Sequence, residues 1–273
     1  MTTAHDVFSG RTAVITGAGS GIGEGLARHA ATLGMNLVLA DVDTARLDAL
    51  APELPGEVLC VPTDVADPAA VDRLAEAAFE RFGSVELVVN NAGIMTIGYA
   101  WEIPADRWDA AIDVNLRGVV NGVRSFVPRL LEQGTRAHVV NLSSVGGFLP
   151  SPMMAPYTAT KFAVLGLTES LALELQMRES PVRVSVVTPG PVRSEIFAQA
   201  PATDDPALLG FHDYLARQNA EEGIPGEEYA RIVLDAVAAG EYWVITHPAF
   251  TDAGLAARAE MIRTRTAPSI ALG

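Results

Sequence analysis

Residues 11–23 read RTAVITGAGSGIG, and this stretch decides the fold. Its first six residues form a short apolar run that predicts a buried strand, and the glycine-rich segment follows at once. Ile22, Leu26, Ala30 and Leu33 then recur at helical spacing. Glycines let a backbone approach a pyrophosphate closely, and the N-terminus of a helix offers free amides and partial positive charge. Strand, turn and helix together indicate a dinucleotide-binding unit; the alternative is a flexible turn.

Strands and helices continue to alternate along the chain. Apolar runs predict six further strands, at 36–40, 58–61, 85–89, 137–142, 182–187 and 242–246. Most of these runs are continuous, as in strands buried on both faces. A long helical pattern covers about 104–131, and Pro128 is expected to kink or end it. We therefore expect an α/β fold, a Rossmann-type doubly wound parallel sheet of about seven strands with helices on both faces.

Composition excludes several classes of function. The net charge of -14 disfavours nucleic acid and anionic membrane surfaces as partners. No apolar stretch is long enough to span a bilayer, and residues 1–10 do not resemble a signal peptide. The single cysteine, Cys60, allows no internal disulfide, which favours a cytoplasmic location and a structural thiol. His212 and His247 lack metal-ligand spacing to a partner, so no metal is expected.

Asp41 ends the second predicted strand, 24 residues after Gly17. A carboxylate at this place accepts hydrogen bonds from a ribose diol and repels a 2′-phosphate. Val42 and Ser20 stand where an arginine would favour that phosphate, so the sequence favours NAD over NADP. Arg46, one helical turn beyond Asp41, is the cation that could still reach the phosphate. The alternative interpretation makes Asp41 the cap of the following helix.

Lys161 is the only lysine in the chain, and Tyr157 precedes it by four residues. On a helix this spacing puts both side chains on one face. A phenol has a pKa of about 10, and a neighbouring ammonium lowers it by favouring the phenolate. The pair could therefore donate and accept protons nearer neutral pH. The simpler alternative is a surface pair on an amphipathic helix.

Polar or turn-forming residues follow several other predicted strands. Asn90 and Asn91 end the fourth, Ser144 follows the fifth and Pro189 follows the sixth. Ligands of doubly wound sheets bind beyond the carboxyl ends of the strands, so these segments converge on one edge. Asn115 lies inside a helical pattern and, taken alone, reads as a satisfied core amide.

Together these segments resemble the short-chain dehydrogenase/reductase family, in its short single-domain form. The matching segments occur in the family's order within about residues 10–195, and Ser144 has the usual family spacing to Tyr157. The resemblance implies that residues 1–273 form a single dinucleotide-binding catalytic domain. It implies cofactor contacts at Gly17, Ser20, Gly21, Ile22, Gly23, Asp41, Asp64, Val65, Asn91, Ala92, Gly93, Tyr157, Lys161, Pro189, Gly190, Val192 and Ser194.

The resemblance also implies a mechanism. Tyr157 exchanges a proton with the substrate oxygen. Lys161, with the positive nicotinamide, lowers the pKa of Tyr157 and holds the nicotinamide ribose. Ser144 donates a hydrogen bond to the substrate oxygen, and Asn115 holds a water that links Lys161 to solvent. The implied activity is an NAD(H)-dependent oxidoreductase acting on a secondary alcohol or its ketone. The alternatives are a non-catalytic dinucleotide-binding regulator and an epimerase or dehydratase, which usually carries a larger C-terminal domain.

Substrate and partner expectations rest on apolar residues. A lid is expected at about 195–226, and a C-terminal tail follows about residue 247. Predicted substrate contacts are Ser144, Met95, Phe148, Met154, Tyr157 and Phe197. The apolar members could equally pack in the core or between subunits. Helices at about 104–131 and 156–178 carry surplus apolar positions, and family members commonly pair these helices, so a homo-oligomer, a tetramer, is expected.

Overall fold

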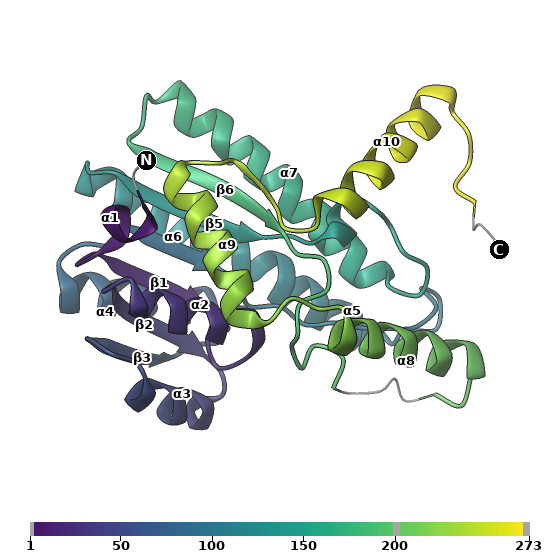
Figure 1. Ribbon diagram of the computed structural model, residues 1–273, viewed down its shortest axis with the longest axis horizontal. Helices are drawn as coiled ribbons and strands as arrows, with labels where there is room; N and C mark the ends of the chain where they lie inside the picture. Colours follow the sequence, from purple (N-terminus) through teal and green to yellow (C-terminus); the bar gives the residue numbers. More distant parts are fainter. Residues whose placement is uncertain (1–2, 199–202, 270–273) are drawn as a thin grey trace.

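Seven parallel strands form one sheet in the order β3-β2-β1-β4-β5-β6-β7 (Figure 1). The computed structural model describes residues 3–198 and 203–269, so residues 199–202 of the predicted lid and 270–273 of the tail lie outside the described residues. The strands are β1 (Thr12–Thr16), β2 (Asn36–Asp41), β3 (Val58–Pro62), β4 (Leu87–Asn90), β5 (Ala137–Leu142), β6 (Val182–Thr188) and β7 (Trp243–Ile245). The predicted seven-stranded parallel sheet is confirmed.

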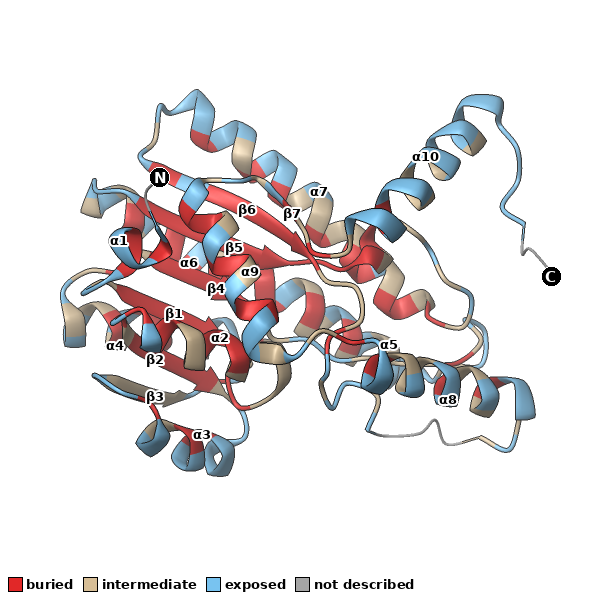
Figure 2. Cartoon of the chain, in the orientation of Figure 1, coloured by how far each residue is buried: buried red, intermediate tan, exposed pale blue. Residues whose placement is uncertain are grey.

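Helices cover both faces of this sheet (Figure 2). They are α1 (Ala4–Phe8), α2 (Gly21–Thr32), α3 (Thr44–Leu50), α4 (Pro68–Phe82), α5 (Ala105–Ile112), α6 (Gly118–Gln133), α7 (Ala155–Met177), α8 (Pro206–Glu221), α9 (Gly226–Ala239) and α10 (Pro248–Thr264). One core cluster joins the sheet to α1, α2 and α9, and the other joins it to α4, α6 and α7. Because β1, β4 and β5 lie between these layers, every residue in them is buried.

The long helical pattern at 104–131 differs from the expectation. It divides into α5, a π-helical turn at Asp113–Arg117 and α6. Pro128 lies inside α6 and does not end it. Its neighbours Phe126 and Leu130 are fully buried, whereas Pro128 faces solvent. Packing on both sides of Pro128 therefore outweighs the missing hydrogen bond, and water can reach the carbonyl that loses its partner.

The carboxyl ends of the strands bring the predicted site segments to one edge. The turns after β1, β2, β4, β5 and β6 all leave the sheet there, since every strand pair is parallel. Helix α8 lies beyond this edge, within the predicted lid (Figure 1). Helix α10 extends away from the sheet, and Thr251 is its only described residue that is buried.

Candidate active site

The glycine-rich turn is shaped by close backbone approaches. Gly17 has a φ of 64°, and a Cβ there would lie 2.8 Å from Ala92 Cα. A Cβ on Gly23 would overlap the carbonyl oxygen of Gly17, so α2 packs directly on the turn. Ser20 is the N-cap of α2, and its side chain makes no capping hydrogen bond. The first amides of α2 therefore face the sheet edge without a side-chain cap, as a pyrophosphate site requires.

Asp41 braces this turn. Its Oδ2 accepts a hydrogen bond from Gly19 N at 2.9 Å, and its Oδ1 accepts one from Asp43 N at 3.0 Å. The cap of α3 is Asp43, whose side chain accepts from Arg46 N, so Asp41 is not the helix cap. Asp41 is half-buried beside the glycine turn, which is the position expected of a ribose-binding carboxylate.

Thr16 and Asn91 tie β1 to the turn after β4. Asn91 N donates to Thr16 Oγ1 at 3.0 Å, and Asn91 Nδ2 donates to the carbonyls of Thr16 at 2.8 Å and Gly17 at 3.1 Å. Asn91 thus holds the glycine turn in place from the end of the neighbouring strand. The sequence patterns do not predict that the Thr16 hydroxyl accepts a hydrogen bond from Asn91 N. A hydroxyl at the end of a buried strand, directly before a glycine, is the feature that could have indicated it.

Tyr157 and Lys161 lie one turn apart near the start of α7, and both are buried. The Lys161 ammonium lies 5.5 Å from the centre of the Tyr157 ring and donates to Leu142 O at 2.9 Å. The alternative of a surface pair is therefore wrong. Leu142 ends β5, so the amine is fixed to the sheet edge.

Burial shifts both groups toward their neutral forms. Burial raises the pKa of the Tyr157 phenol, and the nearby Ser144 hydroxyl opposes this more weakly. Burial lowers the pKa of Lys161 to about 8. The expected lowering of the pKa of Tyr157 is therefore wrong for the protein alone, because desolvation of the phenolate dominates.

Ser144 and Tyr157 flank Gly146. A Cβ on Gly146 would lie 3.4 Å from both Ser144 Oγ and Tyr157 Cε1, so the two side chains converge. The neighbouring Ser143 is buried and donates to Lys161 O at 2.8 Å. Ser143 thus anchors α7, which supports the choice of Ser144 as the substrate-facing hydroxyl.

Asn115 lies in the π-helical turn and is fully buried. Its Oδ1 accepts from Ile94 N at 2.7 Å, and its Nδ2 donates to Ile94 O at 2.9 Å. A Cβ on Gly93 would lie 3.4 Å from Asn115 Oδ1 and 3.6 Å from Lys161 Nζ, so all three groups meet. The side chain is a satisfied core amide, as expected from the residue alone, and it also borders the Lys161 amine.

Asp64 and Val65 hold the turn after β3. Asp64 is exposed, and its Oδ1 accepts from Ala66 N at 2.9 Å. Val65 is buried, and its carbonyl accepts from Asn121 Nδ2 at 2.8 Å. Asn121 was not foreseen as a site residue, because a polar position inside a helix gives no sign of its partner.

The segment after β6, residues 189–194, also lies at the carboxyl edge of the sheet. Pro189 O accepts from Val145 N at 2.9 Å, which links this segment to the Ser144 turn. Gly190 N donates to His247 Nδ1 at 3.2 Å, so His247 has a structural contact. Val192 is buried, and a Cβ on Gly21 would lie 3.0 Å from Ser194 Cβ. Ser194 therefore faces the glycine turn directly.

The predicted substrate contacts are less closely grouped. Met154 and Phe148 are buried, whereas Met95 and Phe197 are half-buried. Phe148 packs against Trp243 with ring centres 5.7 Å apart, so its burial has a structural explanation. His212 Nε2 lies 3.0 Å from Phe197 O and connects the first described part of the lid to α8. These substrate contacts stay predictions.

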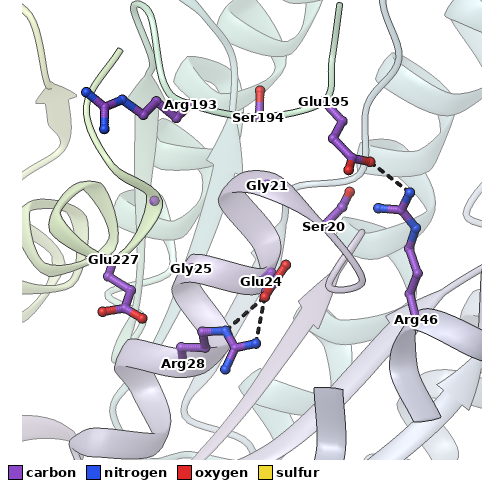
Figure 3. Close-up of a pocket in the computed structure, with 11 residues that line it drawn as sticks. Ser20, Gly21, Glu24, Gly25, Arg28, Arg46, Arg193, Ser194, Glu195 and Glu227 are labelled. Carbon is purple, nitrogen blue, oxygen red and sulfur yellow. Dashed lines mark hydrogen bonds and ion pairs between the residues drawn. The ribbon is translucent and has the colours of Figure 1, made fainter. Parts of the chain in front are cut away.

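A cavity of about 330 Å³ lies outside the glycine turn, between α2, α9 and the segment after β6 (Figure 3). Ser20, Gly21 and Ser194 line it, but Ser144, Tyr157 and Lys161 do not. It therefore borders the cofactor turn without being the site of the Tyr157 chemistry. Among residues 3–198 and 203–269, no cluster of His, Cys, Asp and Glu could hold a metal. In the same part of the chain, no helix is long and apolar enough to cross a bilayer.

Comparison with known proteins places these features in a family. The family model for short chain dehydrogenase matches residues 11–205. The chain is 36% identical over 246 residues to 1-deoxy-11-beta-hydroxypentalenate dehydrogenase from Streptomyces arenae, covering 87% of this chain and 82% of that protein.

Solved structures agree. A short chain dehydrogenase/reductase from Burkholderia phymatum in complex with NAD superposes with a TM-score of 0.93 and 38% identity, covering 98% of this chain and 99% of that one. An alcohol dehydrogenase from Thermococcus sibiricus complexed with 5-hydroxy-NADP has a TM-score of 0.74 and 26% identity, covering 86% and 95%. The two relatives carry different dinucleotides, so the fold alone does not decide the cofactor.

Proposed function

This chain belongs to the short-chain dehydrogenase/reductase family of oxidoreductases, and on that premise we propose that it is an NAD(H)-dependent enzyme that oxidises a secondary alcohol or reduces its ketone. The observation that carries the proposal is the convergence of Ser144 and Tyr157 around Gly146, with Lys161 one helical turn away. A phenol, a hydroxyl and a buried amine in this arrangement can bind one oxygen atom and move its proton.

Tyr157 is the acid/base of the proposal. During oxidation its phenolate oxygen accepts the proton of the substrate alcohol, and during reduction the neutral phenol donates a proton to the ketone oxygen. The Lys161 ammonium lies 5.5 Å from the centre of the Tyr157 ring. While Lys161 is protonated, its positive charge stabilises the Tyr157 phenolate. Ser144 donates a hydrogen bond to the substrate oxygen, which stabilises the negative charge that develops there.

NAD is the proposed cofactor, and when bound it supplies the hydride acceptor or donor. The glycine turn and the uncapped first amides of α2 would hold its pyrophosphate. Gly17 and Gly23 allow this turn to pack closely on Ala92 and on the start of α2. Asp41 would accept hydrogen bonds from the adenosine ribose and oppose a 2′-phosphate. The NAD complex of the Burkholderia relative supports this choice.

The substrate is proposed to be largely apolar, with Met95, Met154 and Phe197 contributing to its pocket. We further propose one catalytic domain whose segment at about 195–226 acts as a lid. The homotetramer, the cytoplasmic location and the role of the tail after about residue 247 stay predictions.

The proposal is tested by a panel of secondary alcohols with NAD and of ketones with NADH, followed by NADH absorbance. At least one class of apolar alcohol or ketone should be turned over. NADH binding without turnover of any member of a broad panel would favour the non-catalytic regulator instead.

A further inference from the structure

Arg46 stands beside the site proposed for the adenosine ribose. A Cβ on Gly19 would lie 3.0 Å from Asp41 Oδ2 and 3.1 Å from Arg46 Cβ, so these two side chains flank the same point of the glycine turn. A 2′-phosphate on a ribose held by Asp41 would come within reach of an arginine side chain at this position. Arg46 is therefore the cation best placed to offset the charge of Asp41 against NADP.

The structure directs this cation elsewhere. Arg46 Nη2 lies 2.7 Å from Glu195 Oε2 (Figure 3). Arg46 Nε lies 3.2 Å from Asp43 Oδ2. Glu195 belongs to the segment that leaves β6, immediately after Ser194, and lies far from Arg46 in sequence. Two other arginines line the cavity. Arg28 pairs with Glu24 and Glu53, and Arg193 lies on the other side of Ser194 from Glu195 (Figure 3). Glu195 is thus the carboxylate that draws Arg46 toward the lid.

We propose that Glu195 is a cofactor-specificity residue that acts through Arg46. While Glu195 holds the guanidinium, the 2′-phosphate of NADP faces Asp41 without a compensating charge. If Arg46 turns to the phosphate, Glu195 is left without this partner in a chain of net charge -14. Either arrangement weakens NADP binding. NAD binding is unaffected, because NAD carries no 2′-phosphate. The inference rests on the proposed NAD(H) function and adds to Asp41 a second acidic residue, from the segment after β6.

A competing explanation is mechanical. The Arg46–Glu195 pair also joins α3 to the start of the lid, so it could simply keep the lid closed over any dinucleotide. A latch of this kind would affect NADH and NADPH equally, while the specificity role changes their ratio. The two side chains are 45% and 64% exposed, so solvent screens the pair and the effect should be modest.

The test measures dissociation constants of NADH and NADPH by fluorescence titration at low salt, for the wild type, Glu195→Gln, Arg46→Gln and the double variant. We expect Glu195→Gln to tighten NADPH by about two- to fivefold, with NADH nearly unchanged. The double variant should lose this gain, because Arg46 is no longer present to meet the phosphate. Raising the salt concentration should shrink the gain.

Glu227→Gln is the matched control, since Glu227 is a carboxylate that lines the same cavity from α9. It should leave the NADPH to NADH ratio unchanged. An equal shift of both dissociation constants in Glu195→Gln would overturn the proposal in favour of a latch, and so would a gain that survives in the double variant. Failure of the wild type to bind NADH is a different result, which would refute the proposed function itself.

Discussion

At the scale of single residues, the proposed chemistry depends on two buried groups whose neutral forms are favoured by burial. The pKa of Tyr157 is raised and that of Lys161 is lowered to about 8, so desolvation favours the uncharged phenol and the uncharged amine. Lys161 can stabilise the phenolate electrostatically only while it remains protonated. In the proposed mechanism, proton transfer from the substrate to Tyr157 therefore depends on the positive charge that Lys161 keeps below about pH 8.

The buried amine predicts a pH dependence of stability. In the unfolded chain Lys161 returns to its ordinary pKa of 10.5, so its unfavourable contribution is fully present below about pH 8 and disappears as the pH rises toward 10.5. From about pH 8 to pH 9.5, the free energy of unfolding of the wild type should rise relative to that of Lys161→Met, by up to about 2 kcal/mol. Tyr157 opposes this only above about pH 10.

Urea unfolding of both proteins across this interval checks the prediction. Lys161→Met also leaves Leu142 O without the amine, which lowers stability equally at every pH and does not affect the comparison. Parallel curves for the two proteins would show that the amine is not desolvated as the structure indicates.

Asp41 predicts the choice of cofactor. A like charge facing a 2′-phosphate costs several kcal/mol, so NAD should be preferred by at least roughly a hundredfold in kcat/KM. Asp41→Asn keeps an oxygen that accepts from the Gly19 amide but removes the charge, so it should lower the ratio of kcat/KM with NAD to that with NADP. Asp41→Ala should lower the same ratio and should also weaken NAD binding. Equal efficiency with both cofactors in the wild type would remove Asp41 from this role.

At the scale of elements, sequence patterns predict what is local. The strand from 12 to 16, the glycine turn and the spacing of Tyr157 and Lys161 are all visible in sequence, because each depends on neighbours a few residues away. The π-helical turn at 113–117 is not visible in the sequence, because Asn115 within it accepts a hydrogen bond from Ile94 N, which is distant along the chain. Pro128 does not end α6 for a related reason, because buried residues pack on both sides of it.

Helix α6 provides a test of how closely it lies on the sheet. A Cβ on Gly122 would overlap the side-chain amide of Asn90, which donates to Asn141 Oδ1 at 2.8 Å. Gly122→Ala should therefore destabilise the protein by about 1–3 kcal/mol. Gly210→Ala is the control, because a Cβ on this exposed glycine of α8 meets nothing within 4 Å. It should be neutral or slightly stabilising.

The denaturant midpoints of the two variants, compared with that of the wild type, test this prediction. If Gly122→Ala is as stable as Gly210→Ala, α6 lies farther from β4 than the structure places it.

At the scale of the whole molecule, the homotetramer stays a prediction, and an exposed apolar side chain provides a way to test it. On α7, Leu173 is 62% exposed, although the buried face of the same helix already packs on the sheet. Light scattering should give a multiple of 28.7 kDa, and Leu173→Glu should lower the average mass at micromolar concentration. A wild type that remains at the mass of one chain across this range would refute the predicted assembly.

The central claim is that Tyr157 is the acid/base of an NAD(H)-dependent oxidoreductase, and Tyr157→Phe tests it most directly because it removes one oxygen atom from a buried ring. The measurement pairs turnover of an identified substrate with NADH affinity. The account predicts that turnover falls by at least about a hundredfold while the dissociation constant of NADH stays within a few-fold. A variant that keeps more than roughly a tenth of wild-type turnover would contradict the account, because the essential proton would then be carried by another group.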